Sequence, residues 1–286
     1  MTSISELMDA DDIVAEMRME RQSFKGSFML VEGPTDVRRF EKFIDTECCS
    51  FVNCWGKQKL LGAVERLNKG GWQDFIALAD ADFDRARSTL KLHDNLVYSD
   101  GHDFEIDTIQ TEVLKRYIKE VADDTLLVEH CTVGDLALRI ASGLIPISGA
   151  KAANADGDIN YPLSEINWLQ CFDGFEMNRE KLAYVILKKD NPTRDRIASL
   201  LEIIEQAGSK YDLWQITNGH DFFAALGACL QSKIATRSRH QASACEIETH
   251  IRLALSDTDL KAMSLYLELT AWQTARSRRL LKQHLH

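Results

Sequence analysis

The sequence predicts an α/β fold, in which a doubly wound, mostly parallel sheet flanked by helices is followed by a mostly helical C-terminal region. Short apolar runs without polar alternation, typical of strands covered on both faces, recur through the first part of the chain. Amphipathic segments with helical spacing separate these runs. Beyond residue 125 helical spacing dominates, so we expect a domain over residues 1–125 and a mostly helical region over residues 126–286.

In the first region, strands and helices are expected to alternate. The predicted strands are Ser27–Val31, Cys49–Cys54, Phe75–Ala79 and Leu96–Ser99. The predicted helices cover Ser5–Arg21, a segment that begins at Asp36, Lys57–Leu67 and Phe104–Val121. In open parallel sheets the functional groups collect at the carboxyl ends of the strands. Acidic residues stand at or beside three of these four ends, namely at Glu32, Asp80 and Asp100.

The second region is expected to be helical with two exceptions. The predicted helices are Thr132–Ser142, Asn178–Lys188, Pro192–Ala207, Asp221–Ile234, Ala242–Leu255 and Asp257–Lys282. The segment Ile145–Ile159 is rich in small and polar residues, which predicts a mobile loop. The apolar run Leu213–Thr217 predicts a strand that rejoins the sheet.

The composition is that of a cytoplasmic globular protein. Apolar residues make up 45% and charged residues 27% of the 286 residues, and no apolar run approaches the length of a membrane span. The acidic start of the chain resembles neither a secretory signal nor a transit peptide. The seven cysteines include no CxxC pair, which indicates buried free thiols and disfavours a zinc ribbon.

The net charge of −10 is unevenly distributed. Residues 231–286 hold nine Lys and Arg against five acids, so the first 230 residues carry −14. The candidate basic surface of this last segment consists of Arg276, Arg278, Arg279 and Lys282. It is expected to contact nucleic acid or a protein partner, and a solvated helix end is the alternative. The apolar residues of Asp257–Lys282 are explained by packing against the same chain or by a homodimer contact.

The strongest chemical signal is a set of carboxylates. Glu32 follows the first predicted strand, and Asp80, Asp82 and Asp84 follow the third. If residues 80–84 are extended, the three aspartates point to one side. Crowded carboxylates repel one another unless a cation neutralises them, and Mg²⁺ or Mn²⁺ suits oxygen ligands. Glu32 is expected to act as a base or as a further ligand. Taken alone, the DADFD segment is equally explained by an acidic surface turn.

A second motif occurs twice. Asp100-Gly101-His102-Asp103-Phe104 and Asn218-Gly219-His220-Asp221-Phe222 each follow a short apolar run and precede a predicted helix. A turn with a helix-capping residue explains both copies by backbone chemistry. The alternative is that their His and Asp side chains face a shared site.

These residues resemble the TOPRIM domain, which type IA and type II topoisomerases, bacterial primases and several nucleases share. The resemblance rests on Val31-Glu32-Gly33-Pro34-Thr35-Asp36 followed by Asp80-Ala81-Asp82, with Gly56-Lys57 at a matching turn. It implies that Glu32, Asp80 and Asp82 hold Mg²⁺ for phosphodiester chemistry. It implies the same role less directly for Asp36, Asp84, Asp103 and Glu105. Lys57 and Lys59 are expected to neutralise phosphate charge, unless they simply begin a solvated helix.

Among TOPRIM proteins, the chain is most similar to stand-alone nucleases of the overcoming-lysogenization-defect type. It is too short for a topoisomerase or a primase and has no set of zinc ligands. Some of these nucleases serve phage-defence systems such as PARIS, in which the nuclease subunit cuts tRNA. This resemblance implies a toxic endonuclease acting on RNA or DNA and an ABC-type ATPase partner. The chain itself has no GxxxxGK[ST] loop for ATP.

Two other interpretations stay open. One is a non-catalytic subunit that keeps the TOPRIM fold as a binding scaffold for an ATPase complex. The other is a metal-dependent enzyme acting on small phosphorylated substrates. Three crowded carboxylates favour catalysis over a scaffold, because a scaffold gains nothing from bringing like charges together.

Overall fold

The computed structural model describes residues 8–285, which divide into two compact units. Unit 1 contains the chain up to Asp80, together with Lys91–Ser99 and Ser256–His286. Unit 2 contains Ala81–Leu90 and Asp100–Leu255. This division differs from the expected boundary at residue 125, because the last part of the chain returns to the unit that contains the N-terminal elements. Local sequence patterns do not reveal such a return.

Unit 1 is built on a four-stranded, fully parallel sheet with the order β2-β1-β3-β4. The strands are β1 (Ser27–Val31), β2 (Cys49–Asn53), β3 (Phe75–Ala79) and β4 (Leu96–Tyr98). Every residue of β1 and β3 is buried, which explains why these runs are apolar throughout. The α/β class and the parallel sheet flanked by helices are confirmed.

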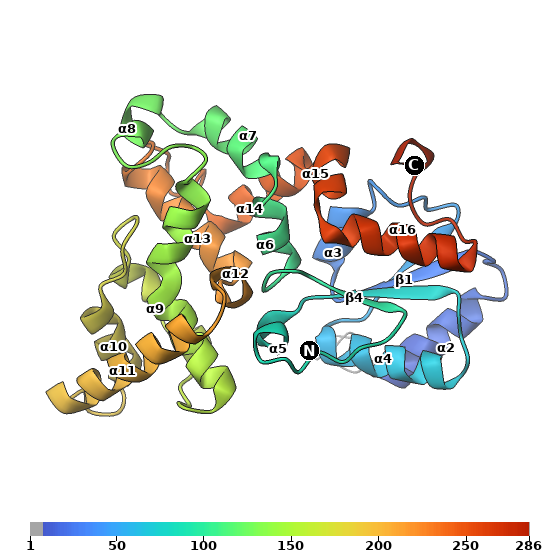
Figure 1. The fold of residues 1–286 in the computed structure, drawn as a ribbon, viewed down its shortest axis with the longest axis horizontal. Helices are drawn as coiled ribbons and strands as arrows, with labels where there is room; N and C mark the ends of the chain where they lie inside the picture. The colour runs from blue at the N-terminus through green and yellow to red at the C-terminus, as the bar shows by residue number, and fades with distance from the viewer. Residues whose placement is uncertain (1–7, 286) are drawn as a thin grey trace. The chain divides into compact units, whose positions relative to one another are not determined.

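Helices cover both faces of this sheet. Figure 1 shows α3 (Pro34–Phe40) and α16 (Ser264–Arg276) on one face, and α2 (Ala10–Glu20) and α4 (Lys57–Lys69) on the other. The remaining helical elements of unit 1 are α15 (Asp257–Ala262) and the 3₁₀ turn η3 (Gln283–Leu285). From β1 the chain moves outward to β2 and then crosses back to β3, so the strand order reverses between β1 and β3. Ligands bind preferentially at such a reversal in open α/β sheets.

Unit 2 is helical, as the sequence predicts for most of this region. In chain order its helices are α5 (Asp82–Ala86), α6 (Phe104–Ile109), α7 (Glu112–Val121), α8 (Asp124–Val128), α9 (Leu136–Asp156), α10 (Arg179–Leu187), α11 (Arg194–Lys210), α12 (Leu213–Ile216), α13 (Gly219–Ser232) and α14 (Ala244–Ala254). Two 3₁₀ turns, η1 (Leu163–Glu165) and η2 (Trp168–Cys171), precede α10. Among the helices of residues 8–285, none combines the length and the apolar character that a membrane span requires.

The loop predicted over Ile145–Ile159 is wrong, because most of it belongs to α9. Its small residues allow close helix packing. A Cβ added at Gly149 would stand 2.4 Å from the Ile204 carbonyl oxygen of α11. Helix α9 even tolerates Pro146 in its interior. Small residues are common both in loops and at tight helix contacts, so composition alone does not separate the two.

Three other boundaries also differ from expectation. Leu213–Thr217 is not a strand, since α12 begins there with Asp212 as its N-cap. The long helix expected over Asp257–Lys282 is interrupted at Met263, whose backbone is extended. The helix expected over Phe104–Val121 is likewise two helices, because Thr111 caps the start of α7. The side-chain caps at Asp212 and Thr111 decide two of these boundaries.

Candidate functional site

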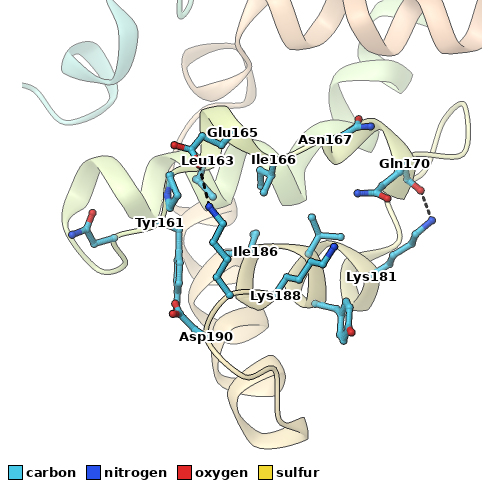
Figure 2. Close-up of a pocket in the computed structure, with 15 residues that line it drawn as sticks. Tyr161, Leu163, Glu165, Ile166, Asn167, Gln170, Lys181, Ile186, Lys188 and Asp190 are labelled. Carbon is cyan, nitrogen blue, oxygen red and sulfur yellow. Dashed lines mark hydrogen bonds and ion pairs between the residues drawn. The ribbon is translucent and has the colours of Figure 1, made fainter.

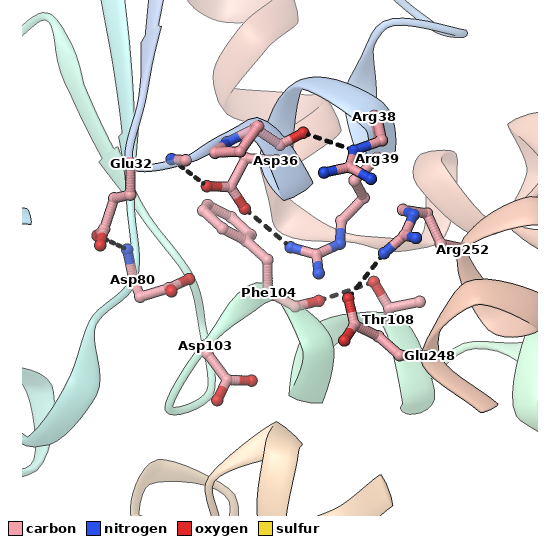
Figure 3. A network of polar contacts seen from close by, with 12 residues as sticks. Glu32, Asp36, Arg38, Arg39, Asp80, Asp103, Phe104, Thr108, Glu248 and Arg252 are labelled. Carbon is pink, nitrogen blue, oxygen red and sulfur yellow. Dashed lines mark hydrogen bonds and ion pairs between the residues drawn. The ribbon is translucent and has the colours of Figure 1, made fainter. Parts of the chain in front are cut away.

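Glu32 and Asp80 lie at the carboxyl ends of the adjacent strands β1 and β3. The register pairs Val31 with Leu78, which brings the residues that follow the two strands to the same edge of the sheet. The backbone N–H of Asp80 donates a 2.8 Å hydrogen bond to Glu32 Oε1 (Figure 3). Both residues are half-buried. The expected juxtaposition of these two acids at the reversal of strand order is therefore present in unit 1.

Asp36 serves the start of helix α3. One of its carboxylate oxygens accepts the Gly33 N–H at 3.0 Å, and the other accepts a 3.1 Å hydrogen bond from Arg39 Nη1 (Figure 3). The Arg39 side chain is only 2% exposed, so this ion pair is largely shielded from water. These contacts give Asp36 a structural role. If the same carboxylate also bound a metal ion, it would have to do so while keeping these two hydrogen bonds.

The turn between β2 and α4 is tied to the backbone of Glu32. Gly56 N–H donates to the Glu32 carbonyl oxygen at 2.8 Å, and Gly56 adopts a φ of 116°, which glycine accepts at little cost. Lys57 begins α4, and its ammonium lies 5.9 Å from the centroid of the Tyr98 ring. Lys57 and Lys59 are half-buried, so their charges are less screened than those of fully exposed lysines.

The prediction that residues 80–84 are extended is wrong. Asp82 opens helix α5, so Asp80, Asp82 and Asp84 do not alternate along an extended chain. Within unit 2, Asp82 has a φ of 49°, and its N–H donates a 2.6 Å hydrogen bond to the His102 carbonyl oxygen. Its Oδ1 lies 3.9 Å from His102 Nε2. Asp84 accepts a hydrogen bond from the Thr89 hydroxyl at 3.1 Å.

The two copies of the repeated motif meet in unit 2. Asp103 is buried and caps α6, where one carboxylate oxygen accepts the Ile106 N–H at 2.9 Å. The other oxygen accepts the Gly219 N–H from the second copy at 2.7 Å. Both carboxylate oxygens of Asp103 therefore accept backbone N–H groups, and these hydrogen bonds give the residue a structural role. Glu105 is half-buried in the first turn of α6.

Gly219 should tolerate no side chain. A Cβ at this position would stand 2.2 Å from Glu105 Cβ and 2.6 Å from Asp103 Oδ1. We expect Gly219→Ala to lower the free energy of unfolding by about 1–3 kcal/mol in urea titrations, through overpacking and loss of the Asp103 contact. Gly134→Ala is the matched control, because the nearest atom there, Thr132 Oγ1, is 3.7 Å away. Equal stability of the two variants would contradict this account.

His102 is a buried histidine in a charged environment. Its Nδ1 is 3.2 Å from the Gln215 carbonyl oxygen, to which Nδ1–H donates. Burial lowers the pKa of His102, while the Asp82 carboxylate raises it and the Lys151 ammonium lowers it. The lowered pKa favours the neutral imidazole. Within unit 2, the charges of Asp82 and Lys151 thus act in opposite directions on the pKa of His102.

Lys151 forms a shielded ion pair that the sequence does not reveal. Its Nζ lies 2.5 Å from Asp221 Oδ2, and the two side chains are 24% and 5% exposed. Lys151 belongs to the segment that was expected to be a loop, and Asp221 to the second copy of the repeated motif. No sequence signal joins residues 70 positions apart.

Asp107 is a further buried acid, and the sequence motifs did not single it out. Its two oxygens accept the Asp100 and Gly101 N–H groups at 2.9 and 2.7 Å. Burial raises its pKa from 3.8 to about 6, against the opposing effect of these hydrogen bonds.

The raised pKa of Asp107 predicts a pH-dependent stability. Well below pH 3.8 the carboxyl is protonated in both the folded and the unfolded state. As the pH rises to 6, the unfolded chain releases this proton first, so the contribution of Asp107 to stability falls. We expect the difference in unfolding free energy between wild type and Asp107→Asn to drop by about 2–3 kcal/mol between pH 4 and pH 7. Urea unfolding at each pH measures it, and a difference that does not vary with pH would contradict the raised pKa.

The candidate basic surface is engaged within unit 1. Arg278 Nη2 lies 3.1 Å from Asp74 Oδ2, and Arg279 Nη2 lies 2.8 Å from Asp45 Oδ2. Arg276 donates to the Gln73 carbonyl oxygen and to Asn95 Oδ1. The backbone N–H of Lys282 donates to the Phe43 carbonyl oxygen at 2.9 Å. These contacts hold this last segment against the sheet unit, and the side-chain contacts supply a structural reason for Arg276, Arg278 and Arg279.

The carboxylates of the site suit Mg²⁺, but they are too few to surround a metal ion with protein ligands alone. Within residues 8–285, no group of three or more His, Cys, Asp or Glu side chains is placed to hold a metal ion. Mg²⁺ commonly binds through one or two carboxylates, with water and substrate phosphate completing its coordination. Glu32 and Asp80, two carboxylates at one sheet edge, fit that pattern. They do not fit a structural zinc site with four protein ligands.

Comparison with known proteins adds no family to these observations. No protein-family model matches the chain, and no curated protein matches its sequence.

Proposed function

We propose that this chain is a Mg²⁺- or Mn²⁺-dependent nuclease that cleaves phosphodiester bonds at the β1–β3 edge of the sheet. The observation that supports it most directly is the hydrogen bond from the Asp80 N–H to the Glu32 carboxylate, at the point where the strand order reverses. Asp82 follows Asp80 by two positions in the chain. The TOPRIM resemblance assigns all three residues to metal-dependent phosphodiester chemistry.

In this proposal each residue has a distinct role. Glu32 accepts a proton at its carboxylate, and its hydrogen bond with the Asp80 N–H keeps that carboxylate oriented. Lys57 begins the helix that follows the Glu32-bound turn, and its ammonium offsets phosphate charge. A bound divalent cation would polarise the phosphodiester and stabilise the attacking and leaving oxygens.

The biological setting is part of the same proposal. We infer that the nuclease is a toxic effector in bacterial anti-phage defence, acts on RNA such as tRNA or on DNA, and is restrained by an ABC-type ATPase. The support is the resemblance to stand-alone TOPRIM nucleases. Expression of the chain without its partner should then slow bacterial growth, and Glu32→Gln should relieve the effect. Equal growth inhibition by both forms would remove this part of the proposal.

A biochemical assay tests the activity itself. The purified chain is incubated with plasmid DNA, total tRNA and a chromogenic phosphate ester, each with Mg²⁺, with Mn²⁺ and with EDTA. We expect cleavage of at least one nucleic acid with either cation, none with EDTA, and no hydrolysis of the ester. Hydrolysis of the ester alone would indicate a phosphatase instead.

A non-catalytic TOPRIM-fold subunit of an ATPase complex is the second candidate. Two observations favour it: no three-donor metal group lies within residues 8–285, and backbone amides and an arginine engage Asp103 and Asp36. In that case neither nucleic acid is cut under any condition, while the ATPase partner still binds the chain.

A further inference from the structure

A cavity of about 510 Å³ lies in unit 2, between the segment that carries η1 and η2 and helix α10 (Figure 2). Leu163, Ile166 and Ile186 supply its apolar surface. This volume is within the usual range for sites that bind small molecules, which combine an apolar surface with a few polar groups. None of its lining residues belongs to the candidate site of Glu32 and Asp80.

Three lysines line the cavity. The Lys181 ammonium donates to the Gln170 carbonyl oxygen (Figure 2). Lys189 lies 3.3 Å from Glu165. Lys188 is exposed, and in the part of the chain that the structure describes it has no ion-pair partner. The only acids among the lining residues are Glu165 and Asp190. In a chain of net charge −10, this local excess of positive charge favours an anionic ligand.

Aromatic and amide side chains complete the lining. Tyr161 and Tyr184 contribute their rings, and the Tyr184 side chain is well exposed. Asn160, Asn167 and Gln170 contribute amides. A tyrosine ring offers a stacking surface for a nucleobase, and amides can donate to and accept from a base edge. We propose that this cavity binds a nucleoside phosphate, with the base against tyrosine and the phosphate at Lys188.

The surroundings favour a single nucleotide over a long strand. A neighbouring hollow of about 470 Å³ shares Asn160, Tyr161 and Asp190 with the cavity. It adds Asp158 and Asp195, so three carboxylates face a single arginine there. A polyanionic strand that continued in this direction would meet like charges. A free nucleotide occupies only the lysine-lined part.

The test is a binding measurement on the full chain in EDTA, which excludes cleavage. Fluorescence anisotropy follows the binding of a fluorescent ADP analogue to wild type and to Tyr184→Ala, Tyr184→Phe and Lys188→Met. We expect Tyr184→Ala and Lys188→Met to raise the Kd at least about fivefold and Tyr184→Phe to bind as wild type does, because the phenyl ring preserves stacking. Lys119→Met is the matched control, since Lys119 is an exposed lysine of the same unit outside the cavity.

Competition separates the possible sources of the ligand. Unlabelled ADP should displace the probe more effectively than a single-stranded hexanucleotide at equal nucleotide concentration. If the hexanucleotide displaces the probe more effectively than ADP, the cavity still recognises a nucleotide, but one that belongs to a single strand. Absence of saturable binding, equal competition by inorganic phosphate, or an equal loss in Lys119→Met would overturn the proposal. Glu32→Gln should bind the probe normally, so a failed cleavage assay and a failed binding assay remain distinguishable.

Discussion

Glu32→Gln is expected to reduce nucleic-acid cleavage by about a hundredfold or more while leaving the fold intact. The amide oxygen of glutamine can still accept the Asp80 N–H, so the hydrogen bond at the ends of β1 and β3 is preserved. What the variant loses is the negative charge and the basic oxygen, which the proposed chemistry requires. Cleavage rates at saturating Mg²⁺ measure the loss of activity, and thermal unfolding shows whether the fold is intact.

The matched control for Glu32→Gln is Glu47→Gln. Glu47 belongs to the same unit but precedes β2 and is exposed, at the opposite end of that strand from the candidate site. It should cleave as wild type does. Asp80→Asn should resemble Glu32→Gln, since both remove one carboxylate from the same sheet edge. If Glu32→Gln retains full activity with an unchanged melting temperature, the catalytic assignment of this edge is wrong.

Lys151→Met is expected to have the largest effect on stability, lowering the unfolding free energy by about 2–4 kcal/mol. Asp221 is only 5% exposed, so removal of its cation leaves a buried carboxylate without its charge partner. The Lys151 side chain is 24% exposed, and water therefore offsets part of the loss. Urea unfolding monitored by circular dichroism measures the difference.

A double variant separates the cost of an unpaired charge from simple loss of packing. Lys151→Met with Asp221→Leu removes both charges and should restore stability to within about 1–2 kcal/mol of wild type. Lys115→Met breaks an exposed ion pair with Glu112, at 42% and 65% exposure, and should cost less than about 1 kcal/mol. If the double variant is less stable than Lys151→Met, the buried charge is not the cause.

Local sequence signals determined the sheet of unit 1. Each of its strands is a short apolar run bounded by polar or turn residues, so the chain segments that form strands were predictable to within one residue. The same signal placed Glu32 and Asp80 at strand ends. Neighbouring parallel strands align their carboxyl ends, so Glu32 and Asp80 lie close together if β1 and β3 are adjacent. That adjacency is known only from the structure.

Tertiary structure alone decided which carboxylates already have structural partners. Asp103 looks like a ligand in sequence, yet it accepts the Gly219 N–H from 116 positions away. The pairing of Lys151 with Asp221 likewise joins two segments that carry no shared pattern. The small residues of α9 resemble a loop until α11 is in place against them. Periodicity and capping are properties of neighbouring residues and can be read along the chain, whereas these partners are set only when distant segments pack together.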